Sequence, residues 1–354
     1  MAQFQGAVYV LVGAMTVGLH SPLLRAGQVE SVKVDQWVLP RMPDGKPDLQ
    51  GVWANNSATP LERPDQLVGR DVLTDFELEN LIERAGRLFS NDADDAAFSD
   101  SVFEAALGDV TDFTSRDRAT GNYNQFWMAE RDFDNRTSLI VDPPSGRLPP
   151  LTIRARQQNE ARQTYLRDHP GDSWTDRRLT ERCITYGIPN LFAGYNTYYQ
   201  IIQTPDYVVM LHEMIHDVRI IPLDNRPHVS DVIRQWHGDA RGYWDGDTLV
   251  VETTNFSRKS ESPGPLYQRV RGSAEDLFLV ERFTRVGPDT IQHALTVNDP
   301  ANYTASWTAM IPLRRSEDAI YEYACHEGNY GIEGILSGYR AQEKVAVESE
   351  ISLR

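Results

Sequence analysis

The alternation of apolar and polar positions from residue 195 onward is typical of β-strands rather than helices. β-Branched and aromatic residues recur there in short runs, separated by glycine, proline, asparagine and aspartate. Asp245-Gly246 is a strong hairpin signal, and residues 224–227 and 287–289 also break the chain. The pattern predicts strands at 196–203, 207–221, 242–244, 248–254, 277–285, 290–297, 303–313 and 319–325.

Many short sequential strands joined by tight turns predict antiparallel pairing, in a closed barrel or a sandwich. Gly51-Val52-Trp53 resembles the G-x-W that opens the first strand of lipocalin-type barrels. We therefore predict a mainly β fold, an antiparallel lipocalin-like β-barrel, as one domain over residues 28–354.

A helical insert at about residues 60–190 decorates this domain. Thr74-Asp-Phe-Glu77 forms a capping box, and a second helix is expected from about Thr152 through Leu166. A short helix is expected near Ala341 in the tail. The apolar residues that recur at helical spacing after the capping box are Leu78, Leu81, Ile82, Ala85 and Leu88.

The N-terminus carries an apolar run at residues 7–19 that is too short to span a bilayer. Its position before residues 20–27 predicts an export signal over residues 1–27, and hence a periplasmic or secreted protein. No lysine or arginine precedes the run, so the alternatives are a buried N-terminal strand or a mispredicted start.

The net charge limits the possible partners, and the two cysteines bear on the redox compartment. A net charge of −16 argues against nucleic acid as a partner, because phosphate binding needs basic clusters. We also expect no stable membrane insertion. The oligomeric state stays open. Cys183 and Cys325 are the two cysteines, and they form either one long-range disulfide in an oxidising compartment or two buried thiols.

Five runs resemble a large family of exported bacterial proteins. They are RTSLIVDPP from Arg136, EMIHD from Glu213, RIIPLD from Arg219, GDTLVVET from Gly246 and YEYACHEGNY from Tyr321. The resemblance covers most of the chain beyond Gly45. It implies export and an all-β core, and it supplies no reaction.

His212, Glu213 and His216 form a literal H-E-x-x-H motif. On a helix, this spacing puts both histidines on one face around zinc, with the glutamate beside the bound water. Here the motif lies in the predicted strand 207–221, where residues i and i+4 are about 13 Å apart. We therefore expect no metal site. A metal-dependent hydrolase that uses these three residues is kept as an alternative.

Strand alternation would place His212 and His216 on one face, and Glu213, Asp217 and Arg219 on the other. If the histidine face points into the barrel, His216 becomes the main general acid or base, because its charge changes near neutral pH. A local bulge would bring the acidic residues round to assist it. The alternative is a solvated salt network, such as Asp217 with Arg219.

Two further clusters combine ionisable and aromatic side chains. His326 and Glu327 stand where the last predicted strand ends, which suits either a ligand-binding barrel mouth or simple turn chemistry. His237 and Asp239 precede a hairpin. Both pairs are alternate catalytic candidates to His216 with its neighbours Glu213, Asp217 and Arg219. The residues that we expect to bind substrate, unless they serve only packing or turns, are Tyr123, Trp127, Trp236, Tyr303, Trp307 and Asn329.

Motifs for nucleophilic catalysis, phosphate loops and dinucleotide binding are missing from the sequence. We therefore expect a cofactor-independent enzyme of isomerase, lyase, cyclase or hydratase type. It would act by acid–base chemistry on a small hydrophobic or aromatic molecule. The main alternative is a periplasmic carrier for an apolar ligand.

Overall fold

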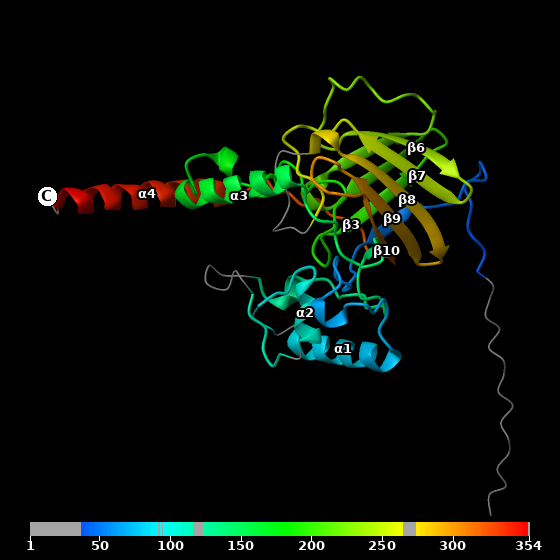
Figure 1. Ribbon diagram of the computed structural model, residues 1–354. Helices are drawn as coiled ribbons and strands as arrows, with labels where there is room; N and C mark the ends of the chain where they lie inside the picture. The colour runs from blue at the N-terminus through cyan, green and yellow to red at the C-terminus, as the bar shows by residue number, and fades with distance from the viewer. Residues whose placement is uncertain are drawn as a thin grey trace, which may run out of the picture. The chain divides into compact units, whose positions relative to one another are not determined.

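The computed structural model describes residues 37–90, 93, 95–108, 110–115, 123–264 and 274–352. Val38–Arg354 form one compact unit. An antiparallel sheet of ten strands dominates this unit (Figure 1). The mainly β prediction is therefore confirmed, whereas the predicted export signal lies outside the described residues.

The sheet consists of two meanders joined through the first strand. Hydrogen-bonded neighbours follow the order β5-β4-β3-β1-β10-β9-β8-β7-β6, and β2 also pairs with β10. The strands are β1 (Gly51–Ala54), β2 (Ile140–Asp142), β3 (Tyr198–Gln203), β4 (Tyr207–His212), β5 (Val218–Pro222), β6 (Asp239–Asp245), β7 (Thr248–Thr254), β8 (Phe278–Gly287), β9 (Thr290–Asn298) and β10 (Trp307–Ser316).

The hydrogen bonds between strands do not close the sheet into the predicted barrel. Within the described residues, β5 and β6 end the ladder and do not pair with each other. They nevertheless lie close, because a Cβ added to Gly242 of β6 would come within 2.8 Å of Ile221 and Leu223. Pro222 has no N–H to donate, which suits an edge strand. The sheet is therefore open at an edge where its two ends touch through side chains.

One face of the sheet packs into the main core. Ile291, His293, Leu295 and Val297 of β9 are all buried, at the period of two expected for a strand. Trp53 lies on β1, as the G-x-W pattern predicts, and its indole N–H donates to the Leu49 carbonyl oxygen at 2.9 Å. His212 of β4 and Glu281 of β8 are buried on the same face as this core.

Four α-helices accompany the sheet in the described part of the chain. Helix α1 (Asp75–Leu88) begins at the predicted capping box, in which both reciprocal hydrogen bonds form. It packs with α2 (Ser101–Leu107), which was not expected from the sequence, around Phe103. Helix α3 (Ile153–Asp168) begins after Thr152 as predicted, and α4 (Gly331–Ser352) is much longer than the predicted short helix.

Two predicted strands are wrong. Residues 207–221 form a hairpin, with β4 and β5 paired so that Leu211 faces Val218. Residues 319–325 form no strand. Instead, Cys325 forms a disulfide with Cys183, which decides between the two states left open for the cysteines.

Candidate active site at the β4–β5 turn

The H-E-x-x-H motif lies at the tight turn of a hairpin. Strand β4 ends at His212, whose N–H donates to the Asp217 carbonyl oxygen at 2.8 Å. Ile215 and His216 have positive φ angles of 60° and 46°, which are costly for side chains of this size. The predicted strand parity is therefore wrong, because a turn replaces the strand after His212.

This turn separates the two histidines of the motif. His212 is buried at 5 % exposure, whereas the His216 side chain is 44 % exposed. Within the described residues, no group of three His, Cys, Asp or Glu side chains converges as ligands for one metal ion. His212, Glu213 and His216 thus do not form the arrangement that the alternative hydrolase requires.

Glu213 is the acidic group of the turn. Burial raises its pKa, against the opposing effect of hydrogen bonds from the Asn196 side chain and the backbones of Tyr198 and Tyr321. Its Oε2 atom is buried and has no hydrogen-bond partner. A carboxyl group that is desolvated and has a spare oxygen suits proton transfer.

Three tyrosine rings form a cluster, and two of these tyrosines belong to segments that contact the turn. Tyr195 lies with its ring centroid 5.7 Å from that of Tyr123 and 6.3 Å from that of Tyr323. Burial raises the pKa of both Tyr195 and Tyr323, so both phenols stay protonated at neutral pH. His216 Nδ1 lies 3.2 Å from the Tyr323 carbonyl oxygen. This contact joins the turn to the segment that carries the neutral phenol of Tyr323.

Asp217 lies on the other side of the turn, in a compact polar cluster. Thr185 donates its hydroxyl proton to Asp217 Oδ2 at 2.9 Å and accepts the Gly187 N–H at 3.0 Å. His237 Nε2 lies 2.8 Å from Thr185 Oγ1 and 3.2 Å from Asp217 Oδ2. Since the hydroxyl proton goes to the carboxylate, the imidazole is a donor here. Thr185 thus cross-links the cluster and is no activated nucleophile.

Arg219 pairs with Glu281 on the buried face of the sheet and not with Asp217, so the pair given as the alternative, a solvated Asp217–Arg219 contact, does not form. Its guanidinium lies 2.5 Å from Glu281 Oε2, and His293 Nε2 lies 3.1 Å from Glu281 Oε1. All three side chains are at most 3 % exposed. Burial opposes ionisation of Glu281, but the Arg219 charge and the His293 hydrogen bond outweigh it and lower the pKa of Glu281.

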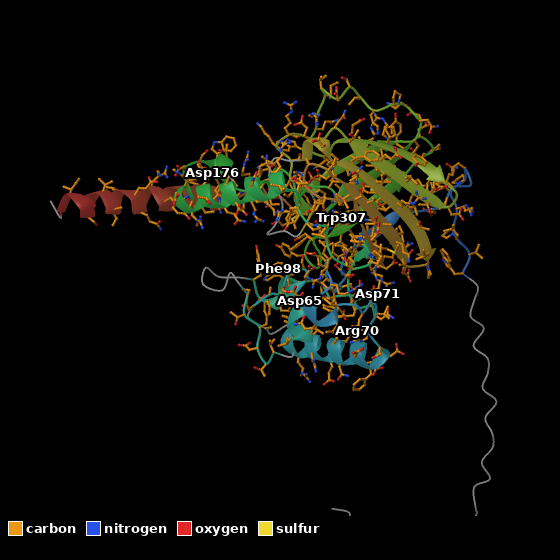
Figure 2. The ribbon with its side chains drawn as sticks, in the orientation of Figure 1. Asp65, Arg70, Asp71, Phe98, Asp176 and Trp307 are labelled. Atoms are coloured by element: carbon orange, nitrogen blue, oxygen red, sulfur yellow. A yellow bond between two sulfur atoms is a disulfide. The ribbon has the colours of Figure 1, made fainter. Side chains whose placement is uncertain are left out.

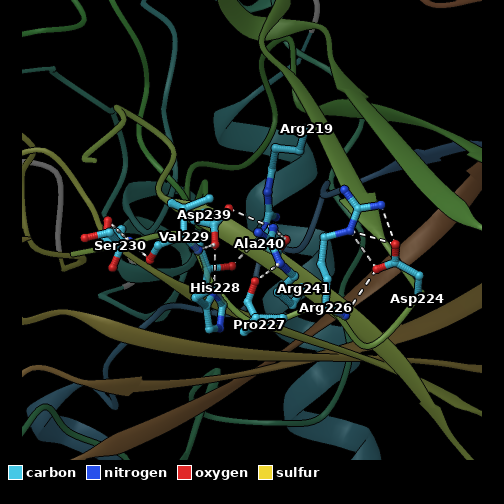
Figure 3. A network of polar contacts seen from close by, with 12 residues as sticks. Arg219, Asp224, Arg226, Pro227, His228, Val229, Ser230, Asp239, Ala240 and Arg241 are labelled. Carbon is cyan, nitrogen blue, oxygen red and sulfur yellow. Dashed lines mark hydrogen bonds and ion pairs between the residues drawn. The ribbon is translucent and has the colours of Figure 1, made fainter. Parts of the chain in front are cut away.

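His237 and Asp239 belong to different networks. Asp239 binds His228 Nδ1 at 2.9 Å, the Val229 N–H at 3.0 Å and the Arg241 guanidinium at 2.7 Å (Figure 3). These contacts occupy both of its oxygens. Asp239 therefore anchors the segment before β6, whereas His237 joins the cluster of Asp217.

The remaining predicted residues scatter over the molecule. His326 and Glu327 are exposed, and the Asn329 amide donates to the Glu181 carbonyl oxygen, a contact between residues 148 apart in sequence. Tyr303 and Trp307 are buried in the core, where Figure 2 marks Trp307. The roles predicted for these residues stay predictions.

The other aromatic candidates, Tyr123, Trp127 and Trp236, are not buried in the core. Tyr123 and Trp127 are 49 % and 60 % exposed, and Tyr123 joins the tyrosines around Tyr195. Trp236 lines a small cavity together with Thr185 and Phe256. Sequence reasoning missed Thr185 and Tyr195. The only signal for Tyr323 was its place beside Cys325.

Comparisons of the chain with protein-family models, with curated proteins and with solved structures find no match. No helix in the described part of the chain has the length and apolar character required to cross a bilayer. We therefore infer function from the geometry of the turn.

Proposed function

We propose that the protein is an enzyme that moves protons on a small hydrophobic or aromatic molecule, with Glu213 as the main acid or base. The observation that carries this proposal is the buried Oε2 atom of Glu213, which has no hydrogen-bond partner in a turn with positive φ angles. Strain and unsatisfied polar atoms concentrate at functional sites. His216 lies next to it at the surface and is the second proton carrier.

The surroundings support this substrate class. Tyr195 and Tyr323 supply neutral phenols that can donate a hydrogen bond to a carbonyl oxygen. Exposed aromatic rings of Tyr123, Phe126 and Trp127 offer apolar contact area. The chemistry would be isomerisation, elimination, cyclisation or hydration without a bound organic cofactor. The carrier remains the rival, because the same aromatic surface can bind without turnover.

Export belongs to the same proposal. The Cys183–Cys325 disulfide supports it, because such bonds persist in oxidising compartments. A lipocalin-like relationship is also proposed, with the touching ends of the sheet at Gly242 and Ile221 as its support.

Solvent deuterium tests the proposal directly. The purified protein would be incubated in D2O with aromatic ketones and β,γ-unsaturated ketones, and exchange would be read by mass spectrometry. We expect exchange at a carbon next to a carbonyl group, and at least about a hundredfold loss in Glu213→Gln. Glu317→Gln is the matched control, since Glu317 is 89 % exposed beside Arg315.

Two results would contradict this function. Ligands that bind without exchange in the unchanged protein would favour the carrier. Equal exchange in Glu213→Gln and Glu317→Gln would remove Glu213 from the chemistry.

A further inference from the structure

A second cleft, separate from the β4–β5 turn, has a volume of about 420 Å³. That size falls within the range of small-molecule sites. Helix α3, the segment around residues 174–182 and the loop at 258–261 form its walls. The lining residues are Arg162, Trp174, Thr175, Asp176, Arg177, Leu179, Arg182, Arg258, Lys259 and Glu261.

The cleft is basic in a strongly acidic protein. Five of its lining residues are cationic and two are acidic, whereas the whole chain carries a charge of −16. Carboxylates outnumber basic residues in the whole chain, but basic residues outnumber carboxylates in this cleft. A concentration of positive charge in a concave surface attracts anions.

Part of this charge is already paired. Arg162 donates to Asp176 Oδ1 at 3.1 Å, where α3 meets the segment marked by Asp176 in Figure 2. Arg177 pairs with Glu181 at 3.0 Å, and Arg258 with Glu275 at 2.9 Å. These ion pairs position the walls of the cleft.

The rest of the charge is available to a ligand. Within the described residues, the side chains of Arg182 and Lys259 form no ion pair. The Nε atom of Arg177 is buried and has no hydrogen-bond partner. The cleft therefore contains donors that the protein itself does not satisfy, and a buried polar atom left unpaired is costly.

Trp174 adds an aromatic surface to these donors. It is 54 % exposed, and the Arg182 guanidinium carbon lies 4.5 Å from the centroid of its ring. This stacking fixes the planar guanidinium, which then matches a carboxylate or phosphate group with little loss of side-chain freedom. The indole offers a platform for a planar ring.

We propose that this cleft binds a small organic anion, whose carboxylate or phosphate group contacts Arg182 and Lys259 while a planar ring packs on Trp174. The proposal is independent of the acid–base function, because none of these residues belongs to the β4–β5 turn.

Isothermal titration calorimetry with benzoate and phenyl phosphate tests this site and tells the two anionic groups apart. Inorganic phosphate controls for charge alone, and phenol for the ring alone. We expect saturable binding of at least one aromatic anion, with both controls at least about tenfold weaker. Arg182→Gln and Lys259→Gln should each weaken binding about tenfold, since a charged hydrogen bond is lost.

Lys344→Gln is the matched control, because Lys344 is exposed on α4 and its ion pair is with Glu348 on the same helix. It should bind as the unchanged protein does, and so should Glu213→Gln. Lys259→Gln guards against misfolding, since the Lys259 side chain supports no ion pair. Lack of saturable binding by both aromatic anions would overturn the proposal. So would unchanged affinity in Arg182→Gln and Lys259→Gln.

Discussion

At the scale of single residues, the buried face of the sheet contains ionisable side chains among apolar ones. Arg219, Glu281 and His293 are nearly fully buried, and the His293 ring stacks on Phe283 at a centroid distance of 4.2 Å. Arg219 also donates to Thr253 Oγ1 at 3.2 Å. Each member of this group needs the others, because an isolated buried charge is strongly disfavoured.

Removing one charge from this group should therefore destabilise the fold strongly. We expect Glu281→Gln to lower the free energy of unfolding by about 3–5 kcal/mol, because it leaves the Arg219 charge uncompensated. The control is Asp245→Asn at the exposed pair with Arg282, where the loss should stay below about 1 kcal/mol. Urea denaturation measures both. Similar losses at the two sites would show that the interior is open to water.

His212 should make stability depend on pH. Burial and the charge of Arg219 lower the pKa of His212 to about 3, so the folded protein holds it neutral. The unfolded chain binds its proton near pH 6.5. Stability from this group is thus present above about pH 6.5 and is lost as the pH falls toward 3.

The size of this effect can be measured against a variant without the imidazole. Between pH 7 and pH 5 the His212 group should remove about 2 kcal/mol from the free energy of unfolding. His212→Phe keeps a ring against Tyr199, which His212 contacts at a centroid distance of 4.1 Å. From pH 7 to pH 5, the free energy of unfolding should therefore fall by about 2 kcal/mol less in His212→Phe than in the unchanged protein. Parallel pH curves for the two proteins would refute the assignment.

At the scale of elements, the conformation of the β4–β5 turn should lower the stability of the fold while it places His216 for the proposed proton transfer. His216 adopts a φ of 46°, where glycine is favoured. We expect His216→Gly to leave stability unchanged or to raise it by about 0.5 kcal/mol, while deuterium exchange falls. Thermal unfolding and the exchange assay are the two measurements. A variant that loses stability and keeps exchange would show that His216 serves only the fold.

Element by element, the sequence predicted most of the strands after residue 195 because each is framed by strong turn signals. Strand β7 has the predicted bounds, and Thr74 caps α1 as expected. The β4–β5 turn was missed because it contains neither glycine nor proline. Its apolar residues Met214 and Ile215 are buried, so they extend the strand pattern across the turn. Tertiary packing here overrides the local signal.

The candidate site could be predicted only in part for the same reason. Glu213, His216 and Asp217 are adjacent in sequence, so a single motif identified them together. Thr185 and Tyr195 reach the turn through loops, and no local pattern marks such long-range contacts. The backbone and arginine partners of Asp239 likewise appear only in the folded chain.

At the scale of the whole molecule, the Cys183–Cys325 disulfide closes a loop with a sequence separation of 142 residues. Chain-entropy reasoning gives about 5 kcal/mol for a loop of this length, and measured contributions are typically about 2–4 kcal/mol. We expect the double variant Cys183→Ser/Cys325→Ser to lose about 2–5 kcal/mol in urea denaturation. Tyr323 stands two residues before Cys325, so proton exchange should also fall, under conditions in which the variant is still folded. Reduced unchanged protein is the control and should match the double variant in both measurements. If stability falls while exchange persists, the disulfide supports the fold alone and the segment around Tyr323 is not part of the active site.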